Sequence, residues 1–176
     1  MPMTSIQTVV NNNLELLAPQ ISNYRILLMI SGGLDSVVLF DILNKNKHYK
    51  IHLFHCNYNS QINSNIAELF CRKLAEKNDC NINIKNTKIS SDNFESNARN
   101  IRYDEAYNIA EKHSIDIILT AHHQDDQLET LYIKKRNGSD WVSNVGIRDV
   151  YNKIRRPMLS ISREDILIYA NCNVLN

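Results

Sequence analysis

Short apolar segments alternate with segments of helical apolar spacing along the chain, and this alternation restricts the fold more than any other feature. Runs of apolar residues typical of buried strands occupy residues 25–30, 51–56, 81–86 and 116–122. Helical spacing predicts helices over about residues 5–18, 35–45, 62–78, 97–113, 125–136 and 162–171. Because strands that alternate with helices form parallel sheets with both faces covered, the sequence predicts an α/β fold.

The bulk composition is that of one ordinary domain. With 176 residues the chain is long enough for one hydrophobic core. Its formal net charge of +1 indicates no polyanionic partner for the whole molecule, although a neutral total can contain a local basic patch. The longest apolar run, residues 26–30, is far too short to cross a bilayer, so we expect a cytoplasmic protein with no membrane partner. The four cysteines include no Cys-x-x-Cys pair, which favours free thiols over a zinc or iron–sulfur site.

The first predicted strand is followed by the sequence SGGLDS, residues 31–36, and helical spacing resumes directly after it. Adjacent glycines let the backbone turn tightly and expose N–H groups, and the following helix adds the positive end of its dipole. Such a turn suits phosphate, with Ser31 and Ser36 as further donors. Asp35 would either hold a magnesium ion or cap the helix. The Walker and dinucleotide glycine patterns are absent, and a plain glycine-rich turn with an aspartate cap is the structural alternative.

Three polar clusters follow predicted strands, at residues 31–36, 55–59 and 122–130. In open parallel sheets the ligand crevice lies outside the carboxyl ends of the strands. We therefore expect the three clusters to meet at one edge of the sheet.

The third cluster is acidic and opens a predicted helix. Asp125 and Asp126 lie four and three residues before Glu129, so these carboxylates share a helix face. They have three interpretations: helix capping, a divalent metal site that includes the preceding histidines, or a pocket for a cationic substrate. The apolar residues of this helix are expected to point toward the core: Leu128, Leu131 and Tyr132.

These motifs together resemble a known family. Residues 31–36 match all six positions of the Ser-Gly-Gly-x-Asp-Ser loop of the N-type ATP pyrophosphatases. Four further stretches resemble motifs of the tRNA-Ile lysidine synthetases, in that family's order: ESNARNIRY (95–103), TAHHQDDQLET (120–130), KRNGSD (135–140) and RRPML (155–159). At residues 55–61 the chain departs from the family, because Tyr58 stands where a second histidine is usual and the arginine is missing.

The resemblance implies a Rossmann-like adenine nucleotide alpha hydrolase fold, with a parallel sheet and helices on both faces. The whole of residues 1–176 would be one catalytic domain, with an N-terminal helix within residues 1–20. The implied reaction uses ATP and Mg²⁺ to adenylate C2 of the wobble cytidine of tRNA-Ile with a CAU anticodon. Free L-lysine then displaces AMP through its ε-nitrogen. This is a ligase reaction that forms a carbon–nitrogen bond.

The resemblance also implies which residues form the site. The catalytic group would be Asp35, His123, Asp126 and Glu129. ATP would be bound by Ser31, Gly32, Gly33, Leu34, Asp35, Ser36, His55, Asn57 and Arg99, with Asp35 also holding Mg²⁺. Substrate contacts would come from Glu95, Arg102, Asp125, Gln127, Thr130 and Arg136. The alternatives are surface arginines paired with nearby acids, a strand-end histidine at position 55, and a solvated loop after residue 136.

Other functions remain open at this point. The family has further regions after the segments matched here, so we expect this chain to be an N-terminal catalytic fragment. The alternatives are another adenylating enzyme such as a tRNA thiolase, an inactive nucleotide-binding module, or a phosphate-sensing domain of the universal-stress type. The oligomeric state is also open, with a homodimer as one option.

Overall fold

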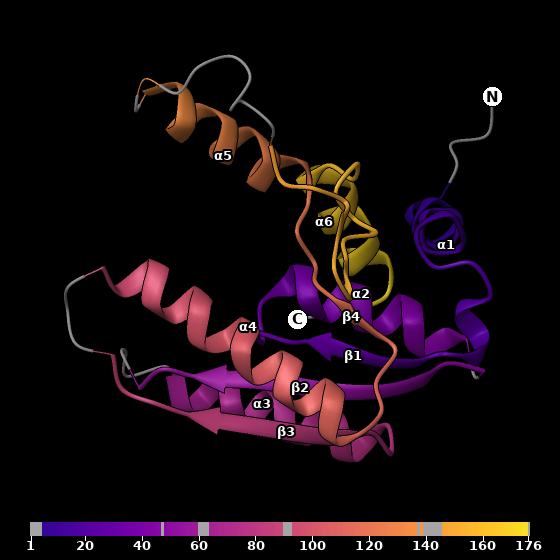
Figure 1. Cartoon of the computed structure of the whole chain (residues 1–176). Coiled ribbons are helices and arrows are strands. Elements are labelled where there is room, and N and C mark those ends of the chain that lie inside the picture. The colour runs from indigo at the N-terminus through magenta and orange to yellow at the C-terminus, as the bar shows by residue number, and fades with distance from the viewer. Residues whose placement is uncertain are drawn as a thin grey trace.

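The computed structural model describes residues 5–46, 48–59, 64–89, 93–136, 138 and 146–175. Its centre is a six-stranded sheet in the order β3-β2-β1-β4-β6-β5 (Figure 1). The strands are β1 (Arg25–Met29), β2 (Lys50–Asn57), β3 (Asn81–Asn86), β4 (Ile117–Leu119), β5 (Val150–Tyr151) and β6 (Ile154–Arg155). All neighbouring pairs are parallel except β5 and β6, which are antiparallel.

The strand order reverses at β1, which lies between β2 and β4. Ile26 of β1 pairs with Ile51 on one side and with Ile117 on the other. Ligands of open α/β sheets bind where the strand order reverses, beyond the carboxyl ends of the strands. The loops after β1, β2 and β4 are therefore the places where a site is expected.

Helices cover both faces of the sheet, which confirms the predicted α/β class. They are α1 (Ile6–Leu17), α2 (Leu34–Lys45), α3 (Ser64–Lys77), α4 (Phe94–Lys112), α5 (Gln124–Arg136) and α6 (Arg163–Cys172), with a short 3-10 helix at Ile21–Asn23. Ile26 and Leu28 of β1 point into one core, with buried residues of α1, α2, α3 and α6. Leu27 and Met29 point into the other core, with buried residues of α4. Within the described ranges, none of these helices is both long enough and apolar enough to span a membrane.

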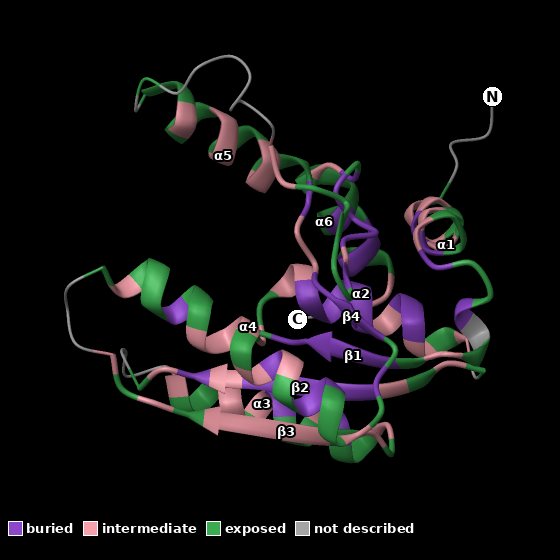
Figure 2. Ribbon diagram, in the orientation of Figure 1, coloured by how far each residue is buried: buried purple, intermediate pink, exposed green. Residues whose placement is uncertain are grey.

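Helix α5 differs from the prediction. Its apolar residues were expected to face the core, but Leu128 is 59% exposed and Tyr132 is 68% exposed. None of its thirteen residues is buried, and Figure 1 and Figure 2 show the helix projecting from the rest of the fold. Helical periodicity shows that apolar residues share a face, but it does not show whether another element lies opposite that face.

Candidate functional site

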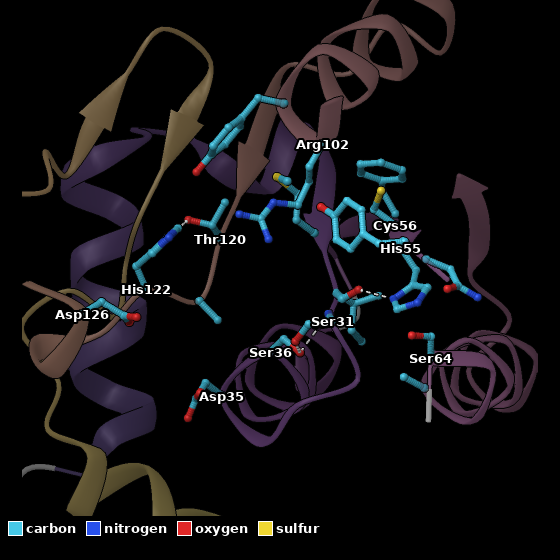
Figure 3. A pocket seen from close by; sticks show the side chains of 18 residues that line it. Ser31, Asp35, Ser36, His55, Cys56, Ser64, Arg102, Thr120, His122 and Asp126 are labelled. Atoms are coloured by element: carbon cyan, nitrogen blue, oxygen red, sulfur yellow. Dashed lines mark hydrogen bonds between the residues drawn. The ribbon is translucent and has the colours of Figure 1, made fainter. Parts of the chain in front are cut away.

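A cavity of about 450 Å³ lies at the carboxyl edge of the sheet, at the reversal of the strand order. It is lined by the carboxyl-terminal ends of β1 and β2, by residues that follow β1, β2 and β4, and by two residues each of α3 and α4 (Figure 3). The predicted meeting of the three polar clusters is therefore observed. The lining residues are Met29, Ile30, Ser31, Asp35, Ser36, Phe54, His55, Cys56, Asn57, Tyr58, Ser64, Ala67, Arg102, Tyr103, Thr120, Ala121, His122 and Asp126.

The loop at residues 31–36 is held in shape by its own serines. The Ser36 hydroxyl donates to the carbonyl of Gly33 at 2.8 Å, and the N–H of Gly33 donates to Ser31 Oγ at 3.1 Å. Because the Ser36 proton is directed to Gly33, that hydroxyl acts as a loop brace here. Helix α2 begins within this segment, at Leu34, and its first N–H groups have no partner inside the helix. These N–H groups and the helix dipole give this end of α2 a partial positive charge, which suits an anion.

Asp35 does not cap α2. Gly33 occupies the N-cap position and makes no side-chain capping bond, while Asp35 lies inside the first turn. Asp35 Oδ1 is buried and has no hydrogen-bond partner in the described part of the chain. The capping explanation of this aspartate is therefore wrong, and its carboxylate remains available for a ligand.

His123 lies between two carboxylates of the site. Its Nε2 is 3.7 Å from Asp35 Oδ2 and 3.6 Å from Asp126 Oδ2, and the side chain is almost fully buried. The backbone N–H of Asp125 donates to His123 Nδ1 at 3.2 Å. Nδ1 is therefore an acceptor, and the neutral ring carries its proton on Nε2, directed toward both carboxylates. His123 connects the phosphate loop to the start of α5.

Asp126 both caps α5 and lines the cavity. Its Oδ2 accepts the backbone N–H of His123 at 2.8 Å, which is the return bond of a capping box. The capping interpretation of the acidic cluster is thus correct for this residue. Because Asp126 also lines the cavity, capping does not exclude a second role toward a ligand.

The other predicted residues of α5 lie outside the cavity. Asp125 and Glu129 are exposed, and Thr130 is half-buried without lining the cavity. Gln127 exchanges two hydrogen bonds with the backbone of Ile147, through Oε1 as acceptor and Nε2 as donor. It therefore fastens the segment before β5 to α5, which differs from the substrate contact expected of it. Arg136 is exposed at the end of α5, and most of the loop that follows lies outside the described residues.

The end of β2 contributes two buried polar residues, both predicted. His55 donates from Nδ1 to the carbonyl of Ile30 at 2.9 Å, so its Nε2 remains an acceptor. Burial lowers the pKa of His55, which favours the neutral ring. Asn57 donates to Asn65 and to Glu68 of α3, at 3.1 and 2.9 Å. These bonds connect the cavity wall to α3.

Helix α4 brings one arginine to the cavity. Arg102 lines it, and its Nε is buried with no partner among the described atoms. Arg99 and Arg102 lie 5.3 and 5.7 Å from the ring centroid of Tyr103, as cation–π neighbours. In the described chain neither arginine forms an ion pair with an acid, so the structural alternative of surface arginines paired with nearby acids is not observed. Arg99 and Glu95 are exposed and do not line the cavity.

The sequence-based assignment missed His122, which lines the cavity, and Arg156, a buried charge that acts on the His122 ring. His122 lines the cavity with its Nδ1 2.7 Å from Thr120 Oγ1. Burial and the nearby arginines, foremost Arg156, lower the pKa of His122 to about 4, so the ring is neutral at physiological pH. Arg156 is itself buried and donates to the carbonyl of Arg148 at 2.5 Å. Both lie inside motifs noted in the sequence, which was the available signal.

The residues fit a magnesium ion that arrives with a nucleotide. Such an ion is bound by one or two carboxylates together with phosphates and water. Asp35, whose buried Oδ1 accepts no hydrogen bond among the described residues, and the neighbouring Asp126 meet that requirement. A site made by the protein alone is not present in the described ranges, where no three His, Cys, Asp or Glu side chains are grouped to hold a metal.

Similar proteins of known structure share this fold. A U34-tRNA thiolase from Methanococcus maripaludis superposes with a TM-score of 0.78 at 17% identity, covering 97% of this chain and 65% of that one. An NH3-dependent NAD synthetase from Campylobacter jejuni superposes with a TM-score of 0.67 at 14% identity, covering 97% and 74%. The adenine nucleotide alpha hydrolase type of fold, expected from the sequence, is thereby confirmed.

Sequence comparison identifies the family. The tRNA(Ile)-lysidine synthases of Bacteroides thetaiotaomicron and Blochmanniella pennsylvanica are each 34% identical to this chain, over 152 and 169 residues. The matches cover 82% and 85% of this chain but 35% and 33% of those proteins, so the chain spans about a third of their length. The PP-loop domain family matches residues 5–176. The chain therefore belongs to the PP-loop domain family.

Proposed function

We propose that this chain is the catalytic domain of a lysidine-forming enzyme acting on tRNA-Ile with a CAU anticodon. The observation that carries the proposal is the meeting of Asp35, from the phosphate loop, with Asp126, from the acidic helix start. Both carboxylates lie within 3.7 Å of His123 Nε2 and line one cavity. On this proposal an ATP site and a site for a cationic amine would be adjacent, and the likeness to lysidine synthases supports the identity of both substrates.

In the first step ATP would bind with its phosphates at the loop and its base in the cavity. The N–H groups at the start of α2 would bind the phosphates, and Met29 and Phe54 supply apolar wall on the inner side of the cavity. A magnesium ion held by Asp35 and Asp126 would offset phosphate charge. The cytidine O2 would attack the α-phosphorus of ATP. The bond from the α-phosphorus to the oxygen that bridges it to the β-phosphate would break, and pyrophosphate would leave with that oxygen.

In the second step the ε-nitrogen of lysine attacks C2 of the activated cytidine, and the bond from C2 to the AMP oxygen breaks. An ammonium group cannot attack, so it must first lose a proton. His122 lies on the cavity wall, but its pKa of about 4 makes it a weak base, so desolvation of the amine in the cavity would favour loss of that proton. Asp126 would attract the amine to the cavity, and Asp125 and Glu129 would add negative charge outside it. The exposed Arg99 and Arg136 would contact tRNA phosphates.

The test mixes the chain with ATP, Mg²⁺, labelled lysine and a tRNA-Ile transcript, and measures AMP release together with lysine incorporation. A tRNA-Met transcript with the same anticodon is the matched RNA control, and Asp35→Asn is the matched protein control. Lysine-dependent AMP with label only in tRNA-Ile is the expected result. AMP without lysine incorporation would favour another adenylating enzyme, and ATP binding without AMP would refute catalysis by this chain. Failure to bind ATP would refute the site itself.

A further inference from the structure

Besides His123, the carboxylate of Asp35 has a cationic neighbour outside the motifs discussed above. Arg163 is the first residue of α6, and its Nη1 lies 3.6 Å from Asp35 Oδ1. Charged hydrogen bonds between nitrogen and oxygen are shorter, about 2.7–2.9 Å. The pair is therefore electrostatic, and both groups keep capacity for hydrogen bonds.

The start of α6 is held in a defined place relative to the phosphate loop. Tyr169 of α6 is buried, and its hydroxyl donates to Asp41 of α2 at 2.8 Å while Lys45 of α2 donates to that hydroxyl at 2.7 Å. At the beginning of the helix, Ser162 caps α6 by accepting the backbone N–H of Asp165 at 3.1 Å. Because α2 carries the loop at its own N-terminus, this packing sets Arg163 beside the loop.

The guanidinium of Arg163 has donors to spare. Its side chain is 52% exposed, and in the described part of the chain the Asp35 contact is the one interaction it makes. A guanidinium has five N–H donors in a planar fork that matches phosphate oxygens. Figure 3 shows Asp35 and Asp126 at one side of the cavity and His55 and Cys56 at the other. Arg163 therefore belongs to the Asp35 side, away from the buried wall where a base would bind.

We propose that Arg163 is a further phosphate-binding residue, which contacts the β- and γ-phosphates of ATP and the pyrophosphate formed from them. This inference rests on the proposed nucleotide site. A nucleoside monophosphate lacks the terminal phosphates and would not reach Arg163. The residue is thus a determinant of triphosphate over monophosphate binding, with Asp35 orienting its guanidinium in the unliganded state.

Calorimetric titration of ATP and of AMP, each with Mg²⁺, tests the inference on three variants. Arg163→Ala should weaken ATP binding by about 10-fold or more, the loss typical of hydrogen bonds to a charged group, and leave AMP binding unchanged. Arg163→Lys should fall between, because it keeps the charge and loses the fork. Arg25→Ala is the control, since it removes an arginine at the opposite end of β1 with the same change of net charge. Inorganic pyrophosphate should compete with ATP less well on Arg163→Ala than on the unaltered chain.

Each other outcome overturns a stated part of this scheme. Unchanged ATP affinity in Arg163→Ala would refute the phosphate contact and leave the nucleotide site intact. Equal weakening of ATP and AMP would assign Arg163 to support of the cavity rather than to phosphate. If the unaltered chain bound neither nucleotide, the proposed site would fail, and the inference with it.

Discussion

Gly32→Ala is the substitution whose cost the structure defines most directly. Gly32 has a φ of +84°, in the left-handed region that side chains other than glycine rarely adopt. An added Cβ would lie 3.4 Å from the Cβ and carbonyl oxygen of Ala67, which is a close contact without overlap. The cost therefore comes from the backbone, and we expect the free energy of unfolding to fall by about 1–2 kcal/mol.

Gly33 provides the matched control one residue away. Its φ is −80°, which alanine adopts freely, and an added Cβ would meet only the Ser31 hydroxyl at 3.3 Å. The poorer capping by alanine is offset by the lower entropy of its unfolded chain, about 0.4–1 kcal/mol. Gly33→Ala should therefore change stability by less than about 0.5 kcal/mol.

Urea unfolding followed by circular dichroism separates the two variants. With a slope of about 2 kcal/mol per molar urea, Gly32→Ala should lower the midpoint by about 0.5–1 M, and Gly33→Ala should leave it nearly unchanged. Equal midpoints for the two variants would refute the argument that the left-handed turn restricts position 32 to glycine. The ATP affinity of each variant, measured below its transition, reports whether the phosphate loop keeps its shape.

Three further predictions concern Asp126 and His122 of the cavity wall and the buried Arg156. Asp126→Asn keeps an oxygen for the capping bond to His123, so the free energy of unfolding should fall by less than about 1 kcal/mol. The KM for lysine, measured with saturating ATP, should rise about 10-fold. An unchanged KM would exclude the lysine role of Asp126. The pKa of His122 is lowered to about 4, below its ordinary value of 6.5, so protonation favours the unfolded chain. The stability that His122 contributes is thus present above pH 6.5 and is lost as the pH falls from 6.5 toward 4. Over this range the urea midpoint should change less steeply with pH in His122→Asn than in the unaltered chain. Identical slopes of midpoint against pH would contradict the buried neutral ring. Arg156→Ala removes a buried guanidinium and leaves the Arg148 carbonyl without its donor. In urea unfolding we expect this variant to lose about 1.5–3 kcal/mol of stability. A loss below about 0.5 kcal/mol, roughly that of a surface change, would show that Arg156 is dispensable.

The sequence alone determined most of the fold. Apolar runs and helical spacing placed β1 to β4 and all six helices, because burial on one or both faces leaves a periodic mark in the residues themselves. The hairpin of β5 and β6 was not predicted, since strands of two residues are too short to show any period. The convergence of the loop at residues 31–36 with the acidic start of α5 also followed from sequence, because parallel strands bring their carboxyl ends to one edge.

Only the tertiary structure decided what each side chain of these motifs contacts. The sequence could not show that His123 connects Asp35 to Asp126, that Gln127 holds the backbone of Ile147, or that α5 leaves its apolar face exposed. It also gave no signal for Arg163, whose place beside the loop results from the packing of α6 on α2. Local periodicity reports which residues share one face of a helix or strand. The partner of a polar group depends instead on contacts between segments far apart in the chain, and these contacts leave no repeating pattern in either segment.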